Sequence, residues 1–237
     1  MPSTSSRSHP DLLVYYGSGE VATLARHKRV VLQADHYLPS DLKFLAAHGT
    51  QALAYLSLGE DTGPEAPWQL AERNPVWGGH YVDPAHPEWL AHVRAQAEVA
   101  LADGFTGLLL DTLETPPMLA GGRLALVTLL SELRGVVGDG YLLANRGHHL
   151  HREIAPFVDG FLFESFSTTW EDGYRALRGR ELLDNATRLR LLQATGREVY
   201  ALDYADKPDL ADFAVQRGTH LGLRVQVTNR NVTGLTG

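Results

Sequence analysis

The sequence predicts an α/β protein folded as a single-domain (β/α)8 TIM barrel. Eight short apolar segments recur along the chain, and stretches with helical periodicity separate them, which is the alternation expected of βα units. The length of 237 residues also fits, because barrels of this class commonly fill about 200 to 250 residues as one domain. Little more than residues 229–237 remains after the eighth segment, so we expect the last helix to be incomplete.

The predicted strands are near-continuous apolar runs, as expected of parallel strands that are buried on both faces. In chain order they are residues 12–17, 30–34, 52–58, 107–111, 141–145, 160–164, 199–203 and 221–227. An open Rossmann-type sheet would also alternate strands and helices, but no Gly-x-Gly-x-x-Gly motif follows the first strand. A closed barrel is therefore the favoured architecture.

The predicted helices lie between these strands and carry apolar residues at helical spacing. In chain order they are residues 20–27, 41–48, 88–102, 120–134, 149–155, 170–194 and 209–217. Ser40 is predicted to cap the second helix, and Gly49 to close it in a left-handed conformation. The proline-containing segment 61–87 is the longest non-helical stretch, and a loop of this length is usually functional in a compact domain.

The composition restricts the partners and the location of the protein. A formal net charge of -7 disfavours nucleic acids and anionic membranes as partners, because both attract clustered Lys and Arg. The absence of cysteine excludes disulfides and zinc-thiolate sites, and no apolar run reaches the roughly 18 residues that span a bilayer. Residues 1–10 are predicted to be a flexible leader before the barrel at 11–237. From the printed sequence we expect a cytoplasmic protein. If a natural leader is missing from this sequence, we expect a secreted protein instead.

Polar residues follow almost every predicted strand, and chemistry in (β/α)8 barrels takes place at this end of the strands. Asp111 ends the fourth strand and Glu164 ends the sixth. A carboxylate that ends an apolar strand is costly unless it has a partner or a role. Strands four and six lie about 10 Å apart at roughly 4.8 Å per step, so converging side chains bring the two carboxyl groups to roughly 5 to 9 Å.

That interval covers the geometries of both retaining and inverting glycoside hydrolases, and the sequence leaves the choice open. In both geometries one acid is protonated while the other stays ionised. The sequence therefore predicts a catalytic pair, with Asp111 as the nucleophile or ionised partner and Glu164 as the general acid/base.

The remaining polar and aromatic residues near the strand ends are predicted to bind the substrate. Carboxylates and amides there can hydrogen-bond sugar hydroxyls, and aromatic rings can stack on sugar faces. The predicted substrate-binding residues are Tyr16, Asp35, Tyr37, Glu60, Trp77, Asn145, Arg146, Asp203 and Tyr204.

Two other functions remain open at this point. Acids that end strands three, four and six could bind Mg²⁺ as in enolase-type barrels, but Lys28, Lys43 and Lys207 do not end a strand and so supply no base. The histidines in the segment 147–151 lack a strong ligand spacing, so we expect no metal and no cofactor. A catalytically silent carbohydrate-binding barrel would use the same aromatic rim.

Five motifs are spread over the chain from about residue 12 to residue 227. They are residues 55–60 (Tyr-Leu-Ser-Leu-Gly-Glu), Val82-Asp83-Pro84 with Trp89, residues 104–111 (Gly-Phe-Thr-Gly-Leu-Leu-Leu-Asp), residues 158–165 (Val-Asp-Gly-Phe-Leu-Phe-Glu-Ser) and residues 202–205 (Leu-Asp-Tyr-Ala). Together they resemble glycoside hydrolase family 114, which is typified by endo-α-1,4-polygalactosaminidases.

The resemblance implies a (β/α)8 barrel that cleaves a galactosamine-rich exopolysaccharide, a cationic amino-sugar polymer. By the same resemblance, Asp111 and Glu164 correspond to the family's fourth-strand and sixth-strand acids. The chain departs from the family pattern at Thr106, where Asp is frequent, and at Thr112 and Glu114, where Asn or Asp is frequent. These departures concern the substrate more than the fold.

Overall fold

The computed structural model describes residues 11–114 and 121–235, and it confirms the predicted (β/α)8 architecture. The barrel strands are β1 (Leu12–Val14), β2 (Arg29–Leu32), β3 (Gln51–Ser57), β7 (Gly107–Asp111), β8 (Tyr141–Asn145), β9 (Gly160–Glu164), β12 (Glu198–Tyr204) and β13 (Arg224–Thr228). They form one eight-stranded sheet in this order, and every hydrogen-bonded pair along it is parallel. The predicted leader, residues 1–10, lies outside the described residues.

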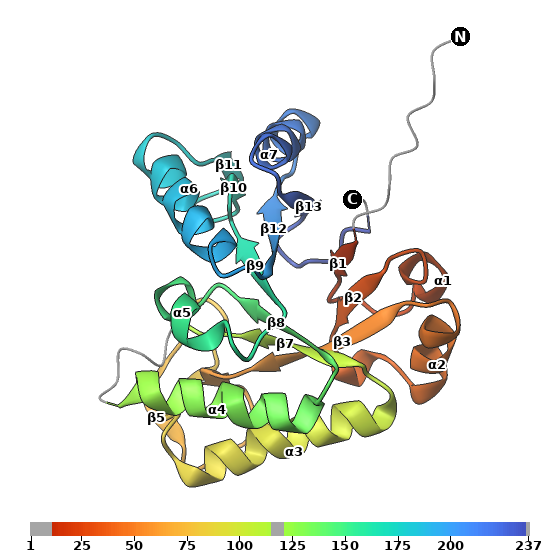
Figure 1. Ribbon diagram of the computed structural model, residues 1–237, viewed down its shortest axis with the longest axis vertical. Coiled ribbons are helices and arrows are strands. Elements are labelled where there is room, and N and C mark those ends of the chain that lie inside the picture. The colour runs from red at the N-terminus through yellow and green to blue at the C-terminus, as the bar shows by residue number, and fades with distance from the viewer. Residues whose placement is uncertain (1–10, 115–120, 236–237) are drawn as a thin grey trace.

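Helices surround the strands, as Figure 1 shows. They are α1 (Val21–Leu24), α2 (Pro39–Ala47), α3 (Pro87–Asp103), α4 (Gly122–Val137), α5 (His151–Ile154), α6 (Arg180–Gln193) and α7 (Pro208–His220), with 3-10 turns η1 (Ala34–His36) and η3 (His148–Leu150). Within the described residues no helix follows β13.

Two of the helix starts that differ from the prediction have a clear structural reason. The helix α2 begins at Pro39 and not after Ser40, because proline suits the first helical position and Asp41 Oδ2 accepts a hydrogen bond from the backbone N–H of Leu38. The helix predicted over 170–194 begins only at Arg180. Gly173 and Gly179, which precede this helix, have positive φ angles of 91° and 49°. Residues 168–176 instead form the antiparallel pair β10 (Thr168–Thr169) and β11 (Arg175–Ala176).

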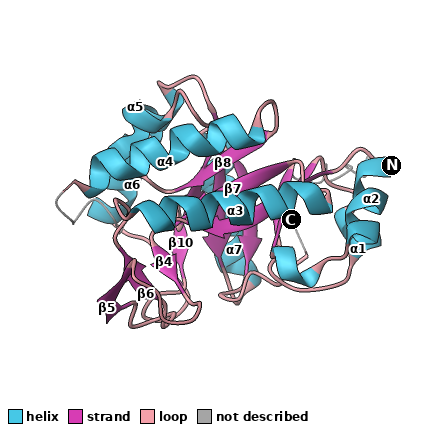
Figure 2. Cartoon of the chain, turned by 90° about the horizontal axis from the view of Figure 1, so that it is seen from below, coloured by secondary structure: helices cyan, strands magenta, loops and turns pink. Residues whose placement is uncertain are grey.

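The long segment after β3 is a small antiparallel sheet and not an irregular loop. Its strands are β4 (Glu60–Asp61), β5 (Gln69–Arg73) and β6 (His80–Val82), with β6 in the middle. Asp61 stabilises the turn after β4, because its carboxylate accepts hydrogen bonds from Trp68 Nε1 at 2.7 Å and Gln69 Nε2 at 2.8 Å. Figure 2 shows this sheet outside the barrel, at one end of the molecule.

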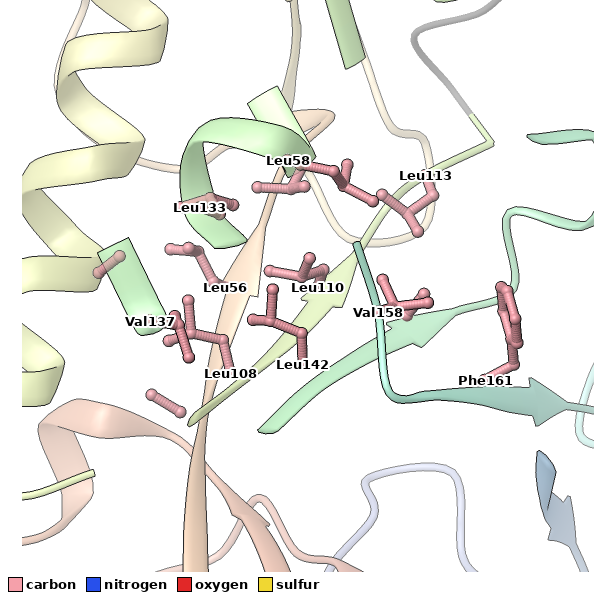
Figure 3. Close-up of a cluster of buried hydrophobic side chains, with 14 of the residues drawn as sticks. Leu56, Leu58, Leu108, Leu110, Leu113, Leu133, Val137, Leu142, Val158 and Phe161 are labelled. Atoms are coloured by element: carbon pink, nitrogen blue, oxygen red, sulfur yellow. The ribbon is translucent and has the colours of Figure 1, made fainter. Parts of the chain in front are cut away.

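The hydrophobic core has two layers, because successive side chains of a strand point to opposite faces. Leu108 and Leu110 belong to the larger cluster, which lies between the strands and the helices and includes Leu133 and Val137 of α4 (Figure 3). Leu109 belongs to the smaller cluster inside the barrel. The amino-terminal end of the barrel is closed by Arg29, whose guanidinium lies 3.8 Å from the centroid of the Tyr141 ring.

The barrel closes between β1 and β13 through a side chain. The Gln226 amide accepts a hydrogen bond from the backbone N–H of Val14 at 2.7 Å and donates one to the carbonyl of Val14 at 2.8 Å. Within the described residues no backbone ladder joins these two strands. The structure contains no described helix that is long and apolar enough to cross a membrane.

Candidate active site

The carboxyl ends of three neighbouring strands carry Asp111, Asn145 and Glu164, one residue from each of β7, β8 and β9. Asn145 Nδ2 donates one hydrogen bond to Asp111 Oδ1 at 2.7 Å and another to Glu164 Oε2 at 3.0 Å. The two hydrogens of an amide nitrogen diverge by about 120°, so the two acceptor oxygens lie about 5 Å apart. The predicted pair of acids is therefore one hydrogen-bonded unit bridged by Asn145.

Each carboxylate also accepts a hydrogen bond from a tyrosine. Tyr55, on β3, donates its O–H to Asp111 Oδ2 at 2.8 Å, and Tyr204, on β12, donates to Glu164 Oε1 at 2.5 Å. Arg146 adds a positive charge on one side only, with its Nε 3.4 Å from Glu164 Oε2. All four carboxylate oxygens thus have a donor, but only Glu164 has a cation.

This asymmetry separates the two acids electrostatically. Burial, followed by the negative charge of Glu164, raises the pKa of Asp111 above its usual range, against the hydrogen bonds that it accepts. Burial also acts to raise the pKa of Glu164, but the charge of Arg146 and the donors Tyr204 and Asn145 outweigh it and lower that pKa. A single proton therefore binds first to Asp111 in the free protein.

The backbone turns sharply after each of the three strands. Thr112, Arg146 and Ser165 follow the three site residues directly, and all three have left-handed φ angles, of 61°, 57° and 54°. A non-glycine residue in this region costs about 1–2 kcal/mol, and such strain is often found at functional sites. At Thr112 the turn is supported by its Oγ1, which accepts hydrogen bonds from the backbone N–H groups of Leu58 and Gly59 at 3.1 and 2.6 Å.

The pair lies in a cleft of about 880 Å³. Tyr16 and Glu60 line it, and the Glu60 carboxylate accepts a hydrogen bond from Asn74 Nδ2 at 2.8 Å. An aromatic wall, defined here as Trp77, Trp170 and Tyr204, forms part of its lining. Its ring centroids lie 5.7 Å apart between the two tryptophans and 6.5 Å apart between Trp170 and Tyr204. The predicted residues Tyr16, Glu60, Trp77, Asn145, Arg146 and Tyr204 thus come together in one cleft.

The cleft is strongly acidic. Its two basic residues are Arg146 and Arg230, and its acidic residues are Glu60, Asp111, Glu114, Glu164, Glu171 and Asp172. A second cavity of about 540 Å³ adjoins it and shares Glu114, Arg146, Glu164 and Glu171 as lining residues. Open space therefore continues past Glu164.

Three predicted substrate-binding residues lie outside this cleft. Asp203 is fully buried, because its side chain points away from the barrel interior that Tyr204 faces, and its Oδ1 accepts hydrogen bonds from the backbone N–H groups of Ser167 and Thr168. Tyr37 is buried, and its O–H lies within 3.3 Å of the carbonyls of Gly17 and Gly19.

The third is Asp35, which lies in the turn η1 after β2 with its side chain 83% exposed. The predictions for Asp203, Tyr37 and Asp35 are corrected accordingly. Each was predicted at or just after the end of an apolar strand, but none of the three lines the cleft.

Tyr55 and Arg230 also line the cleft. Neither was predicted, because neither is a polar residue at the end of a predicted strand. Tyr55 lies within β3, and the period-two alternation that places Ser57 at the rim would also have pointed Tyr55 inward. Arg230 lies in the segment after β13, where no sequence motif marks it.

The histidines of the segment 147–151 have different surroundings. Burial, followed by the charges of Arg188 and Arg146, lowers the pKa of His148 to about 3, so its ring is neutral. His149 is exposed. Among the residues that the structure describes, no three His, Asp or Glu side chains are grouped so that they could hold a metal ion.

Comparisons with known proteins place this geometry among sugar-cleaving enzymes. No protein-family model matches the chain. An uncharacterized protein of Deinococcus radiodurans is 28% identical over 212 residues, which are 80% of this chain and 68% of that protein. The glycoside hydrolase domain of PelA from Pseudomonas aeruginosa has a TM-score of 0.87 and 28% identity, over 95% of this chain and 97% of that domain. Ega3 of Aspergillus fumigatus, solved with galactosamine, shares the fold with a TM-score of 0.72 at 9% identity, over 97% and 96% of the two chains.

Proposed function

We propose that this chain, a glycosidase that resembles glycoside hydrolase family 114, cleaves an α-1,4-linked, galactosamine-containing polysaccharide at internal bonds. The similarity to the PelA domain confirms the resemblance found in the sequence. The observation that carries the proposal is the Asn145-bridged pair of Asp111 and Glu164 in an acidic cleft. The solved complex of Ega3 with galactosamine supports the choice of sugar.

The charge of the cleft favours an amino-sugar polymer. An unacetylated galactosamine residue carries an ammonium group at neutral pH, and acidic side chains attract such a cation along a polymer. Internal cleavage is supported by the open space on both sides of Glu164, because a polymer cut in its middle must continue beyond the scissile bond.

The separation of about 5 Å between the two carboxylate oxygens that Asn145 bridges favours a retaining mechanism, since inverting enzymes need roughly 6.5–9.5 Å between the carboxyl groups to admit a water. In the first step Asp111 attacks the anomeric carbon while Glu164 protonates the departing glycosidic oxygen. In the second step the ionised Glu164 takes a proton from a water, whose oxygen displaces Asp111. We assign the acid/base role to Glu164 because it lines both cavities, so water can reach it, whereas Asp111 lines only the cleft.

This assignment uses the less abundant of the two singly protonated forms. The free protein places the proton on Asp111 first, whereas the reaction needs it on Glu164. Because the two acids interact closely, the proton is shared by the pair, and the limbs of the pH–rate profile belong to the pair and not to one residue. A low pKa makes Glu164 a stronger proton donor, and this recovers part of the cost of the minor form.

The test is a reducing-end assay on galactosamine, N-acetylgalactosamine and mixed polymers, with Asp111→Asn and Glu164→Gln as controls. The proposal predicts new reducing ends and a rapid fall in polymer length, and both variants should abolish them. If the protein binds these polymers without cutting them, it is a carbohydrate-binding barrel. If turnover stops in EDTA and returns with Mg²⁺, the enolase-type alternative is correct.

A further inference from the structure

Arg230 is one of the two cations in the acidic cleft, and it lies over two aromatic rings. Its guanidinium carbon is 4.5 Å from the ring centroid of Trp170 and 5.4 Å from that of Trp77. The three residues come from distant parts of the chain: the turn between β5 and β6, the connection between β10 and β11, and the segment after β13. Such a convergence of an arginine on two indoles forms a defined surface and not a chance contact along one loop.

The segment that carries Arg230 is fixed by hydrogen bonds. The backbone N–H of Arg230 donates to the Tyr174 hydroxyl at 2.7 Å. Beside it, Asn229 closes a turn, because its Oδ1 accepts from the backbone N–H of Thr233 at 3.1 Å and its Nδ2 donates to Thr233 Oγ1 at 3.0 Å. This turn directly follows β13, and it holds the arginine at the rim.

The hydrogen-bond donors of this guanidinium are available to a ligand. Glu171 and Asp172 follow Trp170 in the chain, yet within the described residues no carboxylate lies within ion-pair distance of Arg230, and its side chain has no hydrogen-bond acceptor there. Trp77 is 56% exposed, so its ring is also accessible. The surface therefore offers N–H donors beside apolar ring faces. It lies close to the catalytic pair, because the Trp170 ring is 6.5 Å from that of Tyr204, which donates a hydrogen bond to Glu164.

A ligand for this surface must accept hydrogen bonds. The ammonium group of galactosamine cannot be this ligand group. Like the guanidinium it only donates hydrogen bonds, and its positive charge repels that of the arginine. N-acetylgalactosamine carries a neutral acetamido group at the carbon where galactosamine carries the ammonium group. Its carbonyl oxygen can accept from the guanidinium, and its methyl group can pack on an indole face.

We propose that Arg230, Trp77 and Trp170 form a subsite that selects an N-acetylated amino-sugar residue, next to acidic positions that take unacetylated ones. This inference rests on the proposed function and deepens it. The preferred substrate is then a partly N-acetylated polymer, and the acetyl groups of its products lie at a fixed distance from the new chain end.

The experiment compares wild-type protein with Arg230→Met, which keeps the length of the side chain and removes its donors and charge. Arg197→Met is the matched control, because Arg197 is an exposed arginine just before β12, at the opposite end of the barrel. The readout is kcat/KM on α-1,4-galactosamine polymers of equal length that are either fully deacetylated or partly N-acetylated. We expect the preference for the partly acetylated polymer to fall about three- to tenfold in Arg230→Met, and to stay unchanged in Arg197→Met.

Mass spectrometry of the products gives a second readout. The acetyl position relative to the new end should be fixed for wild type and scattered for Arg230→Met. An equal loss on both polymers, or an unchanged ratio with an unchanged acetyl position, overturns the inference, because Arg230 would then bind a hydroxyl group common to both sugars or nothing at all.

A binding measurement separates failure of the subsite from failure of the proposed function. Calorimetry with N-acetylated oligosaccharides on the Glu164→Gln protein reads the subsite without turnover. Adding Arg230→Met in that background should weaken binding, and an unchanged affinity overturns the subsite. Absence of hydrolysis of every polymer by wild type overturns the proposed function instead.

Discussion

The hydroxyl oxygen of Tyr204 lies 2.5 Å from Oε1 of Glu164. Burial and the charge of Glu164 raise the pKa of Tyr204 well above its usual value, so the phenol keeps its proton and remains a donor. A donor to a carboxylate favours the charged form of that carboxylate. Tyr204 thus helps to set the pH at which Glu164 accepts the proton that it must deliver.

Replacing Tyr204 with Phe should move the alkaline limb of the kcat/KM profile to higher pH. The lost hydrogen bond is one of the causes that lower the pKa of Glu164, so this pKa rises, by about one unit at most. Because the pair shares its last proton and holds it first on Asp111, the limb moves in the same direction by less than this shift. Tyr15→Phe is the matched control, because Tyr15 is buried outside the cleft and its O–H lies 3.4 Å from the carbonyl of Ser18. An unmoved limb would show that Tyr204 has only a packing role.

Replacing Asp111 with Asn or Glu164 with Gln should leave the protein folded and reduce hydrolysis by several orders of magnitude. Each amide fills the same space and keeps hydrogen bonds, but it cannot act as a nucleophile or transfer a proton. The measurements are the reducing-end assay and the melting temperature of each variant. Near-normal hydrolysis in either variant would remove that residue from the catalytic pair.

The anomeric configuration of azide products should assign the two roles. With Asp111→Ala, azide fills the space of the lost carboxylate and attacks the α-linked substrate directly, so we expect a β-glycosyl azide. With Glu164→Ala, azide attacks the covalent intermediate on Asp111 and gives the α-glycosyl azide. Nuclear magnetic resonance distinguishes the two anomers, and the reverse outcome would exchange the roles of the two acids.

Asp203 should make folding stability depend on pH. Burial raises its pKa to about 6, even though the backbone N–H groups of Thr168 and Ser167 bind the carboxylate. The pKa of Asp203 in the unfolded chain is about 3.9. Between this value and the folded pKa, the folded state holds a proton that the unfolded state lacks. The free energy of unfolding therefore falls as the pH rises through this window, by about 3 kcal/mol at most. We expect Asp203→Asn to be less affected by pH between 4 and 6.

Denaturant unfolding of wild type and Asp203→Asn at pH 4 and pH 7 measures this difference. The variant should gain stability relative to wild type at the higher pH. Equal differences at the two pH values would mean that Asp203 titrates alike in the folded and unfolded chain.

The strands that build the site could be predicted from sequence because burial on both faces leaves a nearly unbroken apolar run. The predicted bounds of β7, β8 and β9 match the structure at both ends, and a polar residue marks the end of each. Neighbouring strands of a barrel present their carboxyl ends together, so Asp111, Asn145 and Glu164 could be placed near one another.

The direction of a side chain at a strand end could not be predicted as well. Asp203 and Tyr204 are adjacent on β12, and adjacent side chains of a strand point to opposite faces, so only one of them could face the cleft. The role of Arg230 depends on the packing of three separate segments, and the small sheet β4, β6, β5 forms from a segment without apolar alternation. Such long-range packing leaves little trace in local sequence patterns.

The Gln226 side chain that joins β1 to β13 gives the barrel a seam that can be observed separately. The Val14 amide proton is protected from exchange with deuterium by one side-chain oxygen, whereas amides within the other strand pairs are protected by a backbone ladder. Rotation of the Gln226 side chain breaks this hydrogen bond without unpairing any strand. We expect the Val14 amide, which is buried, to exchange through local motion at the seam, and the amides of β7 and β8 to exchange at the slower rate of cooperative unfolding.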